Sequence, residues 1–186
     1  MVTKTETTDI ITKPKVQDEV HPSFKRWLKH FFYMPASKRY FNKQDQNAIA
    51  NAVTEAEHGH IGEIQVVIEG HIPSNEAYYL DTRARAKQLF AELGVWDTEK
   101  NSGVLLYLNL CEQKVEIVID RGINQATTQE QWQAICDHMV QQLKQKQYRQ
   151  AVILGVTQIG DILNTFYDNE FEDIANEITN NPIILN

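Results

Sequence analysis

Apolar positions recur along the chain with the periods of helices and of strands in turn. In residues 48–56 they lie three or four positions apart, which predicts a helix that begins at the N-cap pattern of Asn42 and Asp45. The β-branched run 62–69 predicts a strand. The nearly all-apolar run 104–110 predicts a central strand that is covered on both faces.

Three further helices are predicted by the same spacing. Ser74 is the expected N-cap of a helix that ends at Gly94, because glycine commonly follows the last helical residue. Thr127 and Glu130 form a capping-box pattern at the start of the next helix. A last helix covers residues 152–166.

The order of these elements predicts the fold class. Residues 114–119 form another strand pattern, and the short link from the run 104–110 favours an antiparallel hairpin. Helices precede and follow a hydrophobic group of strands, which is typical of a layered α/β sandwich.

Composition divides the chain into four segments. Residues 1–22 are polar without a period and are expected to be a flexible tail. Residues 23–41 predict a basic aromatic helix, and residues 42–168 predict one globular domain. Residues 169–186 are acidic and then Asn-rich, so we expect a polar C-terminal tail.

The basic aromatic helix allows two interpretations. Its apolar residues recur at helical spacing beside Lys and Arg side chains, so it could make peripheral contact with an anionic membrane. The favoured interpretation is that its stripe packs on the domain, and Pro35 ends the helix in either case. The stripe consists of Trp27, Leu28, Phe31 and Phe32.

Charge and cysteine content exclude some classes of protein. With 18 Lys and Arg against 25 Asp and Glu, the formal charge of −7 gives no general electrostatic footprint for nucleic acid. The two cysteines have no CxxC spacing and are expected to be reduced and buried. No apolar run approaches the roughly 18 residues of a membrane span, so we expect a cytoplasmic chain, peripheral at the inner face of the membrane if segment 23–41 binds there.

A loop and a strand end carry the candidate chemistry. Asp97, Glu99 and Asn101 place oxygen ligands at alternate positions, as a cation-binding loop requires, although the spacing is not that of an EF-hand. Asp120 closes the strand 114–119 and could complete a metal site, and Arg121 could bind a phosphate or carboxylate. The alternatives are a solvated loop and a surface pairing of Asp120 with Arg121.

Other polar residues give weaker signals. Glu63 begins its own strand and is a further acid that could reach the site. His58 and His60 are too few ligands for zinc without a third, so a loop at the end of a helix is favoured. The sequence has no P-loop, GxSxG or HExxH motif.

Together these segments resemble the TPM domain family, also labelled TPM phosphatase, in its bacterial branch without a membrane anchor. The resemblance is carried by residues 62–67, 93–108, 115–123 and 132–136, and it extends over about residues 23–168. It implies a central mixed β-sheet flanked by helices, with a shallow site near the strand ends that binds divalent cations, calcium in particular, in some members. It also implies acid phosphatase activity in a plant thylakoid branch and accessory or assembly roles at membranes elsewhere.

One departure from the family pattern bears on that site. Where the family often has Asp-Asn-Gly, this chain has Asn101-Ser102-Gly103, so a neutral amide replaces an anionic ligand. Hard cations prefer carboxylate oxygen, and fewer charges imply weaker binding.

Two functions from different classes follow. The first is an accessory module that binds Ca²⁺ or Mg²⁺ weakly, or no cofactor, and acts with a membrane-associated protein partner. The alternative is a metal-dependent acid phosphatase with Asp97, Asn101 and Asp120 as metal ligands and Arg121 on the phosphate. The lack of an evident nucleophile favours the first.

Overall fold

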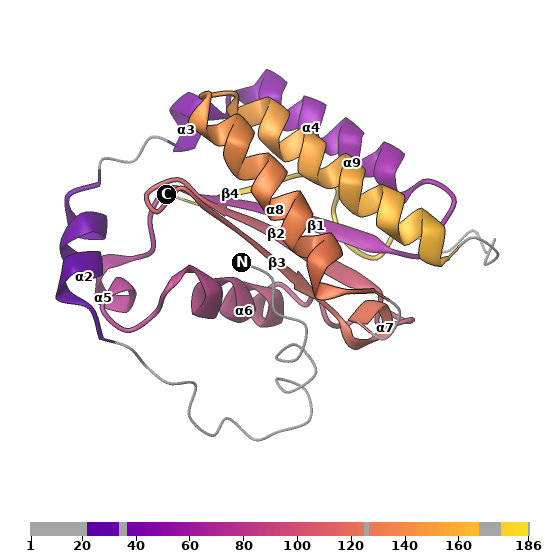
Figure 1. Cartoon of the computed structure of the whole chain (residues 1–186), viewed down its shortest axis with the longest axis horizontal. Coiled ribbons are helices and arrows are strands. Elements are labelled where there is room, and N and C mark those ends of the chain that lie inside the picture. The colour runs from indigo at the N-terminus through magenta and orange to yellow at the C-terminus, as the bar shows by residue number, and fades with distance from the viewer. Residues whose placement is uncertain (1–21, 34–36, 125–126, 168–175, 186) are drawn as a thin grey trace.

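The centre of the computed structural model is a four-stranded mixed sheet. The structure describes residues 22–33, 37–124, 127–167 and 176–185. The strands lie in the order β3-β2-β1-β4, as Figure 1 shows. β1 pairs parallel with β2 and β4, and β2 pairs antiparallel with β3, which confirms the predicted hairpin and the mixed sheet. The strands are β1 Glu63–Glu69, β2 Gly103–Asn109, β3 Lys114–Ile119 and β4 Ile183–Leu185.

Helices cover both faces of this sheet. Side chains alternate along a strand, so Leu106 of the central strand β2 joins the larger buried cluster and Leu105 joins the smaller one. The larger cluster lies under α4, α8 and α9, and the smaller lies under α6 (Figure 1). The predicted layered α/β sandwich is confirmed. These helices are α4 Lys43–Glu57, α6 Thr82–Glu92, α8 Gln129–Lys144 and α9 Tyr148–Phe166.

The helix starts agree only in part with the sequence predictions. Asn42 caps α4, as expected, and Asp45 of the first turn completes a capping box with it. α8 begins one residue later than predicted, with a capping box of Thr128 and Gln131. Thr127 instead accepts the indole N–H of Trp132 at 2.9 Å, so its hydroxyl serves the core rather than the cap.

The helix expected over residues 74–94 is two helices. α5 (Ser74–Ala77) is a single turn, and α6 takes Asp81 as its N-cap, with the Asp81 carboxylate accepting the N–H of Ala84 at 2.8 Å. Gly94 follows α6 with a φ of 68°, as its predicted role at the helix end requires. A further short helix, α7 (Arg121–Asn124), follows β3 directly.

α9 has 19 residues and packs closely on its neighbours. A Cβ at Gly160 would lie 2.8 Å from the Cβ of Ala56, so the glycine allows α4 and α9 to approach closely. Over the ranges that the structure describes, no helix combines the length and apolar character needed to cross a bilayer. Cys111 and Cys136 are free and buried, as predicted.

Residues 183–185 differ from the expected C-terminal tail. They form β4, and Ile183 pairs with Val67 of β1. A strand of three residues after an Asn-rich stretch is too short to show a periodic pattern in the sequence. It forms because the edge of the sheet offers it hydrogen-bond partners.

The N-terminal segment also differs from the favoured interpretation. It forms α2 (Phe24–Phe31) and α3 (Ser37–Tyr40), and most of the aromatic stripe on α2 is exposed rather than packed on the domain. The stripe faces outward because His30 and Arg26, which find polar partners on the domain, take the inner face. Residues 1–21 of the predicted tail and Pro35 lie outside the described residues.

Candidate functional site

Three residues form a row across one end of the sheet. Glu63 of β1 pairs with Gly103 of β2, and the Gly103 carbonyl accepts the N–H of Asp120 at 2.9 Å. Two strand spacings separate Glu63 from Asp120, so their backbones are about 10 Å apart. Gly103 between them lacks a side chain, and a Cβ there would collide with the carbonyl of Val95. Glu63 and Asp120 are therefore not neighbours in the sheet.

Asp120 is fully buried at the end of β3. Its Oδ1 accepts the backbone N–H of Arg121 at 2.6 Å, while its Oδ2 is buried and has no hydrogen-bond partner among the described residues. Burial raises the pKa of Asp120, and the N–H and charge of Arg121 oppose that shift. A buried carboxylate oxygen without a partner costs free energy in the folded state unless a proton or cation meets it.

The loop before β2 lies against the start of α7. Asn101 has a φ of 53°, a left-handed conformation that Asn adopts more readily than most residues. Its carbonyl accepts the N–H of Gly122 at 3.1 Å, and a Cβ at Gly122 would lie 2.5 Å from that carbonyl oxygen. The glycine of the Asp120-Arg121-Gly122 motif is therefore needed for the close approach of the loop.

Arg121 and Asn101 contact each other directly. Nε of Arg121 donates to the side-chain oxygen of Asn101 at 3.0 Å. The structure thus brings three of the four sequence-predicted site residues together: Asp120, Arg121 and Asn101 are linked by adjacency and by this hydrogen bond.

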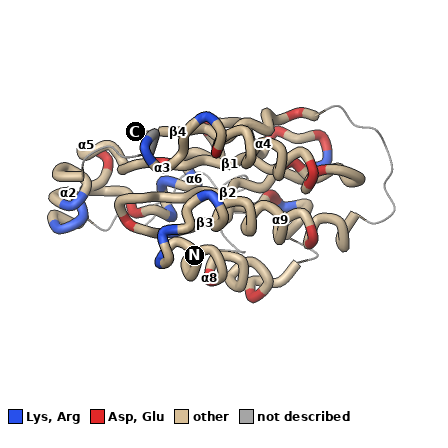
Figure 2. Tube along the Cα trace, turned by 90° about the horizontal axis from the view of Figure 1, so that it is seen from above, with Lys and Arg blue, Asp and Glu red and all other residues tan. Residues whose placement is uncertain are grey.

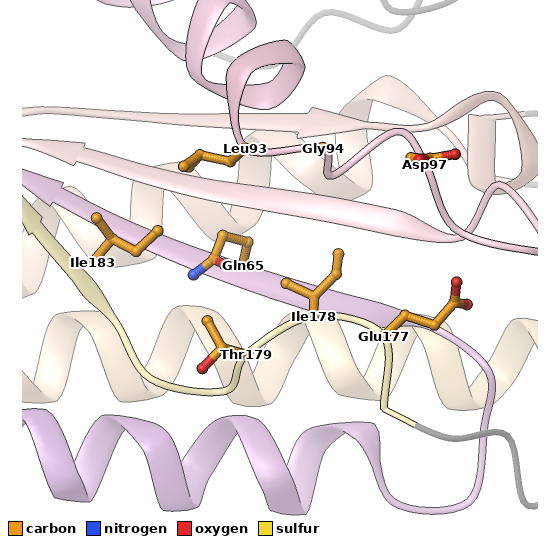
Figure 3. Close-up of a pocket in the computed structure, with 8 residues that line it drawn as sticks. All are labelled: Gln65, Leu93, Gly94, Asp97, Glu177, Ile178, Thr179 and Ile183. Carbon is orange, nitrogen blue, oxygen red and sulfur yellow. The ribbon is translucent and has the colours of Figure 1, made fainter.

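Asp97 lies on another side of the loop. It is exposed and lines a cavity of about 430 Å³, together with Gln65 of β1 and Glu177 of the C-terminal segment (Figure 3). Within the described part of the chain, no hydrogen bond or ion pair links Asp97 to Asn101, Asp120 or Arg121.

Glu63 binds the C-terminal segment instead of joining Asp120. Its two carboxylate oxygens accept the backbone N–H groups of Glu177 and Ile178 at 3.1 and 3.3 Å. Glu177 in turn accepts the N–H of Glu99 with both oxygens at 3.1 Å. Sequence reasoning missed Glu177 because its segment was expected to be a tail.

Glu57 is a second acid that the sequence did not single out. Its Oε1 accepts the N–H of Ile64 at 2.7 Å. Burial raises the pKa of Glu57 to about 8, against the opposing effect of that hydrogen bond, and the nearby charge of Glu63 adds to the rise. Its place in the last turn of a helix resembles that of any solvated acid, so no sequence signal distinguishes it.

The two histidines that follow α4 form part of a turn. Nδ1 of His60 accepts the N–H of Gly62 at 2.9 Å, and His58 is exposed. Burial lowers the pKa of His60, so its imidazole is neutral at physiological pH. This geometry agrees with the favoured reading of a loop at the helix end.

The comparisons with known proteins identify the family. The TPM domain family matches residues 36–162. The chain belongs to the TPM domain family. No curated protein gives a match.

Two solved structures share the fold of this TPM domain. The BA42 protein of the psychrophilic bacterium Bizionia argentinensis is 26% identical, with a TM-score of 0.68 over 77% of this chain and 94% of that chain. The N-terminal domain of a P. gingivalis protein is 17% identical, with a TM-score of 0.59 over 72% of this chain and 82% of that chain. The second likeness concerns the fold alone.

One compact group of metal-ligand types lies where α2 meets the TPM domain. Ligand atoms of His30, Cys111 and Glu112 lie within 4.8 Å of one another, the one such group of His, Cys, Asp and Glu in the described ranges. Nδ1 of His30 accepts the N–H of Ile72 at 3.0 Å, so the neutral imidazole carries its proton on Nε2, which lies 3.2 Å from Glu112 Oε1. A metal ion needs a lone pair on that nitrogen.

The protonation states of Cys111 and Glu112 favour a structural contact between α2 and the domain over a metal centre. Burial raises the pKa of the Cys111 thiol to about 11, which keeps it protonated. Contact with His30, and then the charge of Lys29, lowers the pKa of Glu112 to about 2. The cluster therefore fixes α2 to the TPM domain through a neutral histidine and an ionised glutamate.

Proposed function

We propose that this TPM-domain chain is an accessory module that binds a divalent cation weakly at Asp120 and acts with a membrane-associated protein partner. The observation that carries the cation part is the buried Oδ2 of Asp120, for which the described part of the chain offers no hydrogen-bond partner. A native fold retains such a group only at a cost, and functional sites are where such costs concentrate.

The residues around Asp120 fit a weak site for a hard cation. Carboxylate and amide oxygens are suitable ligands for Ca²⁺ and Mg²⁺. Asp120 supplies the carboxylate, and Asn101 would supply its side-chain oxygen if Arg121 released it. One carboxylate, one amide and a neighbouring guanidinium give low affinity, in the millimolar range of the weakest protein calcium sites.

Asp97 would enter the same site only after a movement of its loop. It faces the cavity beside Glu177 and contributes no contact to Asp120. The proposed site therefore rests on Asp120 and Asn101, and Asp97 is tested by its own variant.

The hydroxyl groups of this loop favour an accessory role over the phosphatase alternative. Ser102 Oγ is buried and donates to the carbonyl of Ile61 at 2.8 Å, and Thr98 Oγ1 accepts the N–H of Ser102 at 2.8 Å. Neither hydroxyl is paired with a side-chain base, as an activated nucleophile requires.

Thermal melts of the full chain in EDTA, Ca²⁺ or Mg²⁺ test the proposal. A ligand that binds only the native state raises the midpoint by mass action. With a dissociation constant near 1 mM, 10 mM Ca²⁺ adds about 1.4 kcal/mol, which corresponds to roughly 3–5 °C in a chain of this size.

Asp120→Asn is the informative variant. The amide keeps an acceptor for the N–H of Arg121 but removes the charge, so its midpoint in EDTA should not fall while the calcium shift should vanish. Asp137→Asn, an exposed acid on α8, is the matched control and should keep the shift. In Asp97→Asn, loss of the calcium shift would mean that the site uses this loop acid, and a retained shift would mean that it does not.

An equal calcium shift in wild type and Asp120→Asn would contradict the site. A metal-dependent phosphomonoesterase activity that Asp120→Asn abolishes would favour the phosphatase alternative instead.

A further inference from the structure

α2 turns His30 and Arg26 toward the domain and most of its aromatic residues toward the outside. His30 is 0% exposed, whereas Phe24, Phe31 and Phe32 are 66%, 55% and 70% exposed. Arg26 points to the domain, where Nε donates to the carbonyl of Ala77 at 2.7 Å and Nη2 to that of Tyr78 at 3.1 Å. A monomeric globular protein normally arranges a surface helix the other way round.

The aromatic rings of this segment form one ordered surface, in which Trp27 is half-buried. Trp27 stacks on Phe24 and on Phe31, each at a centroid distance of 5.2 Å, and Phe32 meets Phe31 edge to face. Leu28 is exposed beside them. We call Phe24, Trp27, Leu28, Phe31 and Phe32 the aromatic face.

Contacts on the inner side hold α2 so that this face stays outward. The backbone N–H of Ser23 donates to the carbonyl of Tyr78 at 2.9 Å, and Ile72 donates to the buried His30 at 3.0 Å. The helix lies at one end of the molecule, as Figure 1 shows, and outside residues 36–162 that match the TPM domain. The aromatic face is thus a rigid addition to the domain.

Positive charge is concentrated on the same part of an acidic chain. Residues 20–44 contain six of the 18 Lys and Arg residues and no Asp or Glu, although the whole chain carries a formal charge of −7. Figure 2 shows Lys and Arg on α2 without an acidic residue on that helix. Lys25 is exposed, and Lys29 is half exposed with Glu112 at 3.3 Å.

We propose that the aromatic face of α2 binds the surface of an anionic lipid bilayer. Trp and Phe side chains partition into the interface between headgroups and acyl chains, and Lys and Arg beside them attract anionic headgroups. A second copy of the chain fits less well, because a symmetric contact through this face would bring together two basic helices that carry no acidic residue. The binding is independent of a cation at Asp120 and extends the proposed function to a lipid surface.

Sedimentation of the full chain with vesicles tests this proposal. The vesicles contain phosphatidylcholine alone or with about one third phosphatidylglycerol. We expect the chain to pellet with the anionic vesicles, to stay in the supernatant with the neutral ones, and to dissociate as salt rises because exposed charges are screened.

Two variants separate the contributions of rings and charge. Phe31→Ser combined with Phe32→Ser should reduce the partition coefficient at least about 10-fold, because each ring favours binding by burying apolar surface in the membrane. Lys25→Gln should reduce it about 5-fold, the effect of roughly one charge at an anionic surface. Trp96→Ser removes an exposed ring far from α2 in the sequence and should change nothing. The side chains of Phe31, Phe32, Lys25 and Trp96 are all exposed, so the thermal midpoints of these variants should stay near that of the wild type.

Three results would overturn the proposal. The first is no pelleting with anionic vesicles, and the second is equal pelleting of the wild type and the double Phe variant. The third is a wild-type dimer in sedimentation velocity that the double Phe variant abolishes, because the aromatic face would then bind a second copy.

Discussion

Arg121 donates from Nε to the side-chain oxygen of Asn101 at 3.0 Å. One of these residues was expected to bind an anion and the other a cation, and in the folded chain they bind each other. The guanidinium takes the amide oxygen that a cation at Asp120 would need. Arg121 is therefore predicted to limit the affinity of the site rather than to create it.

Replacing Arg121 with Gln tests that role. Removal of the positive charge and release of the Asn101 oxygen should tighten Ca²⁺ binding by roughly 5-fold, since a partly screened charge near a site contributes about 1 kcal/mol. Calorimetric titration of wild type and Arg121→Gln gives the two dissociation constants. Arg149→Gln on α9, which removes a cation paired with Asp45 of the neighbouring helix α4, is the control. Weaker binding in Arg121→Gln would show that the guanidinium supports the site.

Glu57 predicts a dependence of stability on pH. Its folded-state pKa of about 8 lies above the ordinary value of 4.5, so between those values the folded chain retains a proton that the unfolded chain has lost. Its contribution to the free energy of unfolding is therefore fully present below about pH 4.5 and declines as pH rises through about 8.

Glu57→Gln removes this titration and keeps an oxygen for the N–H of Ile64. At pH 8.5 the variant should melt roughly 3–6 °C above the wild type, a range that allows for solvent screening. At pH 4.5 the two midpoints should differ little. Melts across this range give the comparison. The exposed Glu55 of the same helix provides the control Glu55→Gln. A constant difference across the pH range would mean that Glu57 is ionised in the folded chain.

Glu63 is predicted to hold the C-terminal segment. In Glu63→Ala, the N–H groups of Glu177 and Ile178 lose their acceptors, so their hydrogen exchange should accelerate at least about 10-fold. Glu63→Gln keeps one acceptor and should give an intermediate rate. Amides in the middle of α9 should be unaffected. Unchanged protection at Glu177 and Ile178 would show that β4 alone holds the segment.

Local patterns were sufficient to predict most of the fold. The apolar run of β2 predicted a central strand because a strand covered on both faces has no polar side to alternate with. Asn42 and Asp45 predicted their cap because a capping box depends on residues three positions apart. These features are determined by neighbours in the sequence, so no tertiary information was needed.

Two features of the fold, β4 and the orientation of α2, depend on contacts between residues far apart in the sequence, so local patterns did not predict them. β4 exists because β1 offers a free edge, and Ile183–Leu185 alone has no strand periodicity. The orientation of α2 depends on partners for His30 and Arg26 that lie 42 and 51 residues away. A helical pattern shows that one face is apolar, but it does not show which face the domain contacts.

The placement of the candidate site residues also depended partly on local pattern and partly on tertiary structure. Asp120, Asn101 and Arg121 were predicted from strand ends, which the antiparallel hairpin brings to one edge of the sheet. Asp97 shares the loop of Asn101, yet its side chain faces the cavity beside Glu177. Alternation along a loop does not determine side-chain direction, because loop backbones lack the fixed period of a strand.

A calcium titration followed by backbone amide NMR tests the central claim most directly. The account predicts saturable shifts in the fast-exchange limit, largest at Asn101, Arg121 and Gly122, and absent in Asp120→Asn. Shifts confined to other parts of the chain, or identical shifts in Asp120→Asn, would contradict a cation site at Asp120.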